Sequence, residues 1–188
     1  MLLWRKRGHW ATRMSGPAIL FAFDHKRDSV RAKVIVEHWR FSGTIEDTGL
    51  VSEAEWATIA KKGEAGLRKH FDAQMKRSCV TVVLIGRETA INPWVRYQIQ
   101  KSYQRGDAII GIYVHNIRLF EEVEQEKGSL YFGAFEMGGK SEGAYFSQFA
   151  KIYDWRDDDG PSELANWIEV ARAQSGRSSP GAIEWLRA

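Results

Sequence analysis

The chain has little cysteine and few patterned histidines. Cys79 is the single cysteine among 188 residues, and the five histidines show no paired spacing of the kind that zinc ligands need. These absences exclude a disulfide framework and a thiolate or histidine metal site. We therefore expect no bound metal and a reducing, cytoplasmic location.

Long apolar runs and phosphate-binding glycine motifs are missing as well. No stretch approaches the roughly 18 consecutive apolar residues of a membrane span, and the apolar part of the N-terminus is short for a signal peptide. Neither a Gly-x-Gly-x-x-Gly fingerprint nor a Walker-type loop occurs. The sequence predicts no membrane association, and any dinucleotide must bind without the Rossmann glycine turn.

The basic charge is confined to one end of the chain. The isoelectric point is about 9.0, yet residues 1–16 carry four basic side chains and no acid, while the remainder has 23 basic and 24 acidic residues. A nucleic-acid-binding domain has a basic footprint of its own, so nucleic acid is not an expected partner. We expect residues 1–16 to be a disordered basic extension, 17–174 a single domain and 175–188 a C-terminal tail.

Apolar segments of strand length alternate with segments of helical character. Residues 18–23, 80–85 and 108–114 are near-continuous apolar runs, which is typical of strands covered on both faces, and 151–155 is a shorter one. We expect helices at 30–39, 53–74, 94–104 and after Pro161, with Val30, Val34 and His38 along one side of the first. Residues 40–52 read as a loop with a short edge strand around Phe41. This alternation predicts a flavodoxin-like, doubly wound parallel sheet in three α/β/α layers.

The loops after two of the strands should meet. Right-handed crossovers bring residues 24–28 and 87–92 together at the carboxyl edge of the sheet, where open α/β sheets bind ligands. A phosphoacceptor receiver domain shares this layout, but it needs an aspartate where this chain has Ile85-Gly86. The acids at Asp154 and 157–159 precede a helix, where acids favour the helix dipole, so we interpret them as capping residues.

Several blocks of sequence carry a more specific signal. Val80-Thr-Val-Val-Leu-Ile-Gly86 is followed by Trp94-Val-Arg-Tyr97, then by Ile109-Ile-Gly-Ile112, and last by Tyr153-Asp-Trp155 with Asp158-Asp-Gly160. In this order they resemble the TIR-like domain of the Thoeris anti-phage defence proteins, over about residues 18–171. The resemblance implies an enzyme that hydrolyses NAD or cyclises its ADP-ribose part into a signal, with NAD as substrate and no other cofactor.

The resemblance also implies which residues form the site. The family helix reads Trp-Val-Arg-Tyr-Glu-Ile with a catalytic Glu, and Gln98 stands at that position here. Trp94, one turn earlier, should share its face. The nucleotide-contacting residues implied by the resemblance lie after the first and third strands and in the first helix: Phe23, Asp24, His25, Arg31, Arg87 and Glu88.

Two readings of function follow from Gln98. Glutamine keeps the length and hydrogen-bonding capacity of glutamate but carries no charge, so the chain is either an NAD-consuming enzyme with impaired activity or an inactive binding and assembly module. The family also implies self-association, a phage-derived trigger and a downstream effector that responds to the nucleotide. The glycine-rich segment 115–150 is either a flap over the nucleotide or an ordered insertion packed on its own domain.

Overall fold

The computed structural model describes residues 18–41, 50–76, 78–119, 125–136 and 143–174. The expectations for the basic extension 1–16 and for the tail 175–188 concern residues outside these ranges. Within them, no helix combines the length and the apolar character that crossing a membrane requires.

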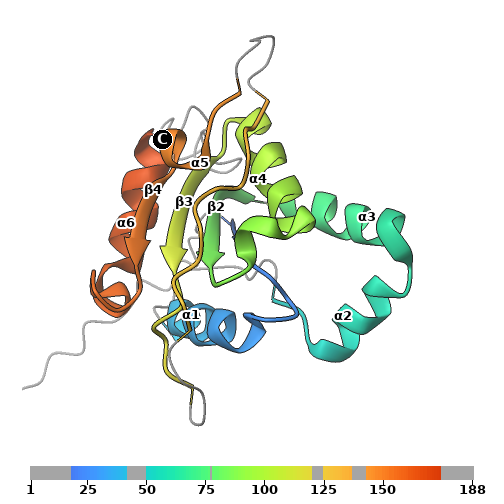
Figure 1. The fold of residues 1–188 in the computed structure, drawn as a ribbon, viewed down its shortest axis with the longest axis horizontal. Helices are drawn as coiled ribbons and strands as arrows, with labels where there is room; N and C mark the ends of the chain where they lie inside the picture. The colour runs from blue at the N-terminus through green and yellow to red at the C-terminus, as the bar shows by residue number, and fades with distance from the viewer. Residues whose placement is uncertain (1–17, 42–49, 77, 120–124, 137–142, 175–188) are drawn as a thin grey trace, which may run out of the picture.

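Four parallel strands form the sheet, in the order β1-β2-β3-β4 (Figure 1). They are β1 (Ala18–Ala22), β2 (Ser78–Ile85), β3 (Ala108–Tyr113) and β4 (Lys151–Asp154). Leu20 pairs with Thr81, Thr81 with Ile109, and Ile112 with Tyr153. All eight residues of β2 are buried, as a central strand with both faces covered requires. This is the flavodoxin-like order without a strand on the outer side of β1 among the described residues.

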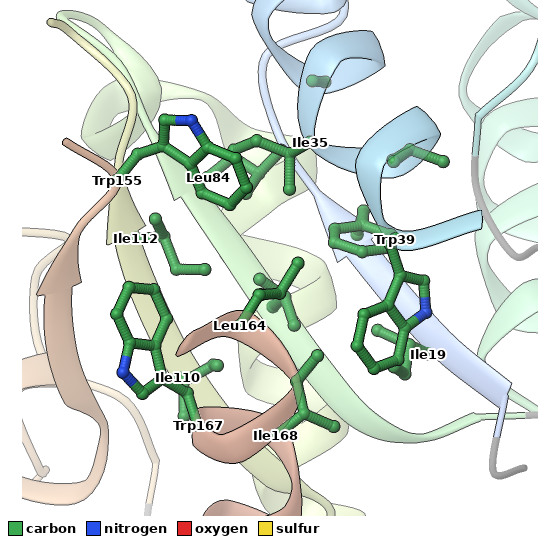
Figure 2. Packing of buried hydrophobic residues seen from close by; sticks show 14 of the residues in the cluster. Ile19, Ile35, Trp39, Leu84, Ile110, Ile112, Trp155, Leu164, Trp167 and Ile168 are labelled. Atoms are coloured by element: carbon green, nitrogen blue, oxygen red, sulfur yellow. The ribbon is translucent and has the colours of Figure 1, made fainter. Parts of the chain in front are cut away.

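Helices cover both faces of the sheet, which makes the predicted three layers. On one face α1 (Ser29–Phe41) and α6 (Gly160–Gln174) pack side by side. Figure 2 shows their Ile35, Trp39, Leu164, Trp167 and Ile168 meeting the strands' apolar side chains. The other face carries α4 (Pro93–Arg105) and the short α5 (Phe146–Phe149). The prediction of a doubly wound α/β fold is confirmed.

Three local expectations were wrong. The helix expected at 53–74 is two helices, α2 (Glu53–Ala60) and α3 (Gly63–Met75), because Gly63 has a φ of +67° that continues no right-handed helix. Phe41 ends α1 and forms no edge strand. Val30 and Val34 are exposed, and α1 instead buries Ala32, Ile35, Val36 and Trp39 against the sheet.

The described part of the segment after β3 is packed scaffold. Phe132, Phe135 and Phe146 are buried in the second core cluster. From α4, Arg96 donates to the carbonyls of Phe132 and Ala134, and Gln100 exchanges two hydrogen bonds with the backbone of Glu136. The structure therefore favours the ordered-insertion reading for this part of the segment.

Candidate functional site

The loop after β1 is built around Asp24. Its buried carboxylate accepts hydrogen bonds from the backbone N–H groups of Lys26 (2.9 Å) and Arg27 (3.3 Å), and its carbonyl accepts from the N–H of Asp28 (2.8 Å). The Asp24 carboxylate therefore satisfies backbone N–H donors of its own loop, as aspartate side chains in turns commonly do. Asp24 thus shapes the loop that presents His25 and Arg27.

The loop after β2 meets this first loop, as the crossover argument predicted. The Thr89 hydroxyl accepts from the Gly86 N–H (2.9 Å) and lies 3.3 Å from Oδ2 of Asp28. A Cβ at Gly86 would fall 2.2 Å from that same oxygen, so only glycine fits here. A short 3-10 helix, η1 (Thr89–Ile91), then leads to α4.

Asp28 is almost fully buried at this junction. Burial raises its pKa to about 6, and the neighbouring Asp24 adds to the rise, whereas Thr89, Arg31 and Arg27 act in the opposite direction. Arg31, expected at the site from the resemblance, is itself one of the most buried side chains of the protein. A carboxyl group in this state can hold a proton near neutral pH.

Two ion pairs tie the loops together at the surface. Arg27 lies 2.6 Å from Glu88, and Arg87 lies 3.4 Å from Glu126 on the segment after β3. Both arginines, with Gln125 and Glu126, line a hollow of about 430 Å³. Arg87 and Glu88 therefore lie at the carboxyl edge of the sheet, and Glu88 is engaged with Arg27.

Aromatic rings form the other wall of the first loop. The His25 ring stacks on Trp56 of α2 at 3.9 Å and 8°, and lies 4.2 Å from the ring of buried Phe23. Burial, with a smaller effect of His70, lowers the pKa of His25 to about 4, so its imidazole is neutral at pH 7. His25 and Trp56 line a second hollow of about 360 Å³, together with Lys26, Ser29, Val51 and Glu53.

The helix α4 carries Trp94 and Gln98. Asn92 caps it by accepting from the N–H groups of Trp94 (2.9 Å) and Val95 (3.2 Å), and Pro93 occupies its first turn. Trp94 packs on Phe71 of α3 at 5.6 Å. Gln98 is only 2% exposed and lines neither of the two hollows described above.

The structure thus gathers most of the expected residues, in two groups. Phe23, Asp24, His25, Arg31, Arg87 and Glu88 belong to the two loops and to the first turn of α1. Trp94 and Gln98 belong to α4, and a chain of ring contacts from His25 through Trp56 and Phe71 to Trp94 connects the groups.

The sequence reading missed three residues of this region: Asp28, Thr89 and Trp56. Asp28 and Thr89 lie in the two loops that were expected to meet, 24–28 and 87–92, but their burial was not expected, and Trp56 was not expected beside His25. The only available signal was polarity just after a strand for Asp28 and Thr89. The crossovers predict that the two loops meet, but the particular contact between Asp28 and Thr89, about 60 positions apart, leaves no local pattern in the sequence.

The acids after β4 are structural. Asp154 accepts from Asn116 (2.6 Å) and from the N–H groups of Arg156 and Asp157, and Asp158 accepts from the N–H of Asp154. These hydrogen bonds hold the turn between β4 and α6, and the capping of α6 by the acids stays a prediction. In the described ranges no three His, Cys, Asp or Glu side chains are grouped so that they could hold a metal ion.

Comparisons with known proteins agree with the sequence blocks. The curated protein named "Putative cyclic ADP-D-ribose synthase ThsB1" from Bacillus cereus (strain MSX-D12) is 24% identical, over 80% of this chain and 97% of its own length. A solved structure, the TIR domain of the Toll-related receptor TRR-2 from Hydra magnipapillata, has a TM-score of 0.46 at 13% identity, covering 82% of this chain and 97% of that one. The model of the TIR-like domain of the Thoeris protein ThsB matches residues 20–118, which is more than half of the chain, and the chain belongs to this family.

Proposed function

We propose that this protein is a TIR-family NAD-consuming enzyme, an NAD glycohydrolase or ADP-ribosyl cyclase that makes a cyclic ADP-ribose-type signal in anti-phage defence. The observation that carries the proposal is membership of the ThsB TIR-like family over residues 20–118. The printed name of the Bacillus cereus relative, a cyclic ADP-D-ribose synthase, supports the same reaction class.

Gln98 determines how fast such a reaction can run. When the N-glycosidic bond to nicotinamide breaks, positive charge develops at the anomeric carbon of the ribose, and a fixed carboxylate nearby stabilises it. Gln98 can bind a ribose hydroxyl, but it has no charge to offer. Losing one preorganised electrostatic group typically costs on the order of 10²–10³ in rate, so we expect slow turnover.

Burial makes the position of Gln98 sensitive to charge. The residue is 2% exposed, and electrostatic interactions are stronger where water is excluded. A carboxylate placed there would therefore act on a developing cation more strongly than one at the surface. The same burial supports the alternative function, an inactive module that binds NAD or a second TIR domain, because an uncharged amide is tolerated there at lower cost than an acid.

The decisive experiment compares NAD turnover by the natural chain, by Gln98→Glu and by Gln104→Glu, with products identified by mass spectrometry. Gln104 is an exposed residue of the same helix, so its variant adds the same charge away from the site. We expect Gln98→Glu to raise turnover by about 10²-fold and Gln104→Glu to leave it unchanged.

Several outcomes would contradict this reading. A Gln98→Glu protein that melts cooperatively and binds NAD, yet cleaves none, would favour the binding module. Equal gains in both variants would mean that net charge, and not position, matters. Cooperative thermal melting of each variant is the control for folding.

The biological setting is part of the proposal. We place the protein in the cytoplasm, where NAD is available, with self-association, a phage-derived trigger and an effector that responds to the nucleotide product. These follow from the family alone. Sedimentation of the full chain with and without NAD would test the self-association.

A further inference from the structure

The imidazole of His25 lies where a ligand ring could stack. It contacts the ring of Phe23 at 4.2 Å, tilted by 38°, and the ring of Trp56 at 3.9 Å, nearly parallel with an interplanar angle of 8°. Offset-stacked rings in proteins adopt this kind of spacing. One flat ring, which the protein supplies from its own loop, thus contacts both Phe23 and Trp56.

Stacking is what keeps the imidazole in this slot between Phe23 and Trp56. Neither ring nitrogen of His25 hydrogen-bonds to a described residue, and His25 belongs to the turn between β1 and α1. His25 is half-buried and is held by ring contacts, and the rotation of a side chain is a fast motion. A ring with a larger stacking surface can therefore displace the imidazole without breaking a hydrogen bond.

The hollow beside the slot has room for the displaced imidazole and for the rest of a ligand. Its volume is about 360 Å³, which is within the usual range for small-molecule sites. Lys26 and Ser29 line it on the loop side and Glu53 lines it on α2. A cation and a hydroxyl suit a phosphate, and a carboxylate suits ribose hydroxyls.

The slot favours an uncharged ring. The pKa of His25 falls to about 4 chiefly because burial disfavours the charged imidazole. The same penalty applies to any cationic ring that takes its place. Of the two rings in NAD, adenine is uncharged at neutral pH, whereas oxidised nicotinamide is a cation.

We propose that the slot between Phe23 and Trp56 binds the adenine ring of an adenine nucleotide, and that His25 occupies it as a built-in competitor when no nucleotide is present. The choice of a nucleotide rests on the proposed function. The slot itself rests on the ring geometry and on the adjoining hollow. While His25 fills the slot, only the molecules in which the slot is free can bind the nucleotide. The apparent affinity falls in proportion to that fraction.

The test is titration of the full chain with AMP, followed by calorimetry. We expect His25→Ala to bind AMP about tenfold more tightly than the natural chain, because the competitor is gone. His38→Ala is the matched control, since His38 lies on α1 against Pro161 and Trp155, outside the slot. Its AMP affinity should stay at the natural value.

Removing the Trp56 ring should reverse the gain in AMP affinity. Base–aromatic stacking supports an expected loss of about tenfold in AMP affinity when Trp56→Leu is added to His25→Ala. Lys26→Gln should weaken the binding of AMP and leave that of adenosine unchanged. Nicotinamide mononucleotide, whose ring is cationic, should gain less than AMP from His25→Ala.

Two results would overturn the slot. One is a folded His25→Ala protein that binds AMP no better than the natural chain, with His25→Ser as a second variant in case the first is unstable. The other is an AMP affinity that is insensitive to Trp56→Leu. AMP has no nicotinamide bond to cleave, so these results are independent of turnover. A gain in AMP affinity without NAD cleavage by Gln98→Glu would leave the slot standing and remove the proposed enzyme.

Discussion

The two edge strands of the sheet are each followed or flanked by a histidine and an aspartate, and the surroundings of these groups act on their pKa values in opposite ways. His25 and Asp28 lie beyond β1, and His115 and Asp154 lie at the ends of β3 and β4, with His115 Nδ1 3.9 Å from Asp154 Oδ2. Burial drives the first pair towards neutrality, since it lowers the pKa of His25 to about 4 and raises that of Asp28 to about 6. Asp154 is also buried, yet its pKa is lowered.

Hydrogen-bond donors account for the difference. Burial alone would raise the pKa of Asp154, but donation by Asn116 and by two backbone N–H groups, with His115 nearby, outweighs it. Among the described residues the Asp28 carboxylate has a single hydrogen bond, from Thr89 to Oδ2, and its Oδ1 has no partner. The β4 end thus has the hydrogen-bond donors that hold a charged carboxylate, whereas the Asp28 carboxylate at the β1 end has too few donors to offset its burial.

The largest expected effect on stability comes from crowding the junction between Gly86 and Asp28. Gly86→Ala places a methyl group 2.2 Å and 2.4 Å from the two carboxylate oxygens of Asp28. Overpacking of this kind should cost about 3 kcal/mol of unfolding free energy in urea. Adding Asp28→Ala removes the clashing oxygens, so the double variant should recover part of the loss. Additive losses would show that the carboxylate is not the obstacle.

The next expected effect comes from the same change, aspartate to asparagine, made at Asp28 and at Asp154. Asp28→Asn should stabilise the protein at pH 7 by on the order of 1–2 kcal/mol, because the natural carboxylate is charged above its pKa in a site that disfavours charge. Asp154→Asn should destabilise by on the order of 1–2 kcal/mol, because its hydrogen bonds lose their charge assistance. Urea unfolding at pH 7 measures both.

The pH dependence of the stability gained by Asp28→Asn tests its electrostatic origin. The pKa of Asp28 rises from an ordinary 3.8 to about 6 on folding, so the natural carboxyl takes up its proton, and recovers stability, as pH falls from 6 to about 4. The advantage of Asp28→Asn should therefore be full above pH 6 and vanish below about pH 4. An advantage that persists at pH 4 would mean that it comes from packing.

Most of the fold could be predicted from the sequence because its signals are local. Continuous apolar runs marked β1, β2 and β3, and the helix expected at 94–104 corresponds to α4. The inward face of α1 could not be predicted this way, since Val30 and Val34 are as apolar as Ile35 and Val36, and only packing against α6 and the sheet chooses between them.

The candidate site divides in the same manner. The positions of Asp24, His25 and Arg87 followed from strand ends and crossovers. The burial of Asp28 and the insertion of Trp56 beside His25 depend on contacts between distant segments, and the break at Gly63 depends on a backbone angle. None of these leaves a periodic pattern in the sequence.

The smallest expected effect concerns acid sensitivity. The pKa of His25 falls from 6.5 to about 4 on folding, so the stability that depends on its neutral ring is full above pH 6.5 and is lost as pH falls towards 4. His25→Leu should change stability by under about 1 kcal/mol at pH 7 and reduce the loss between pH 7 and pH 4. His38→Leu is the control. Equal acid loss in both would assign it to other groups.

The single cysteine of this protein can report how often its core opens, through the rate at which a thiol reagent labels it. Cys79 is 2% exposed, within the central strand β2, and both of its neighbours in the strand are buried. A thiol reagent can reach it only when the structure around β2 opens, so its labelling rate reports an opening of this core cluster. An engineered cysteine at an exposed position of α2 would react with a thiol dye much sooner than Cys79. Movements of that helix could therefore be followed without removing Cys79.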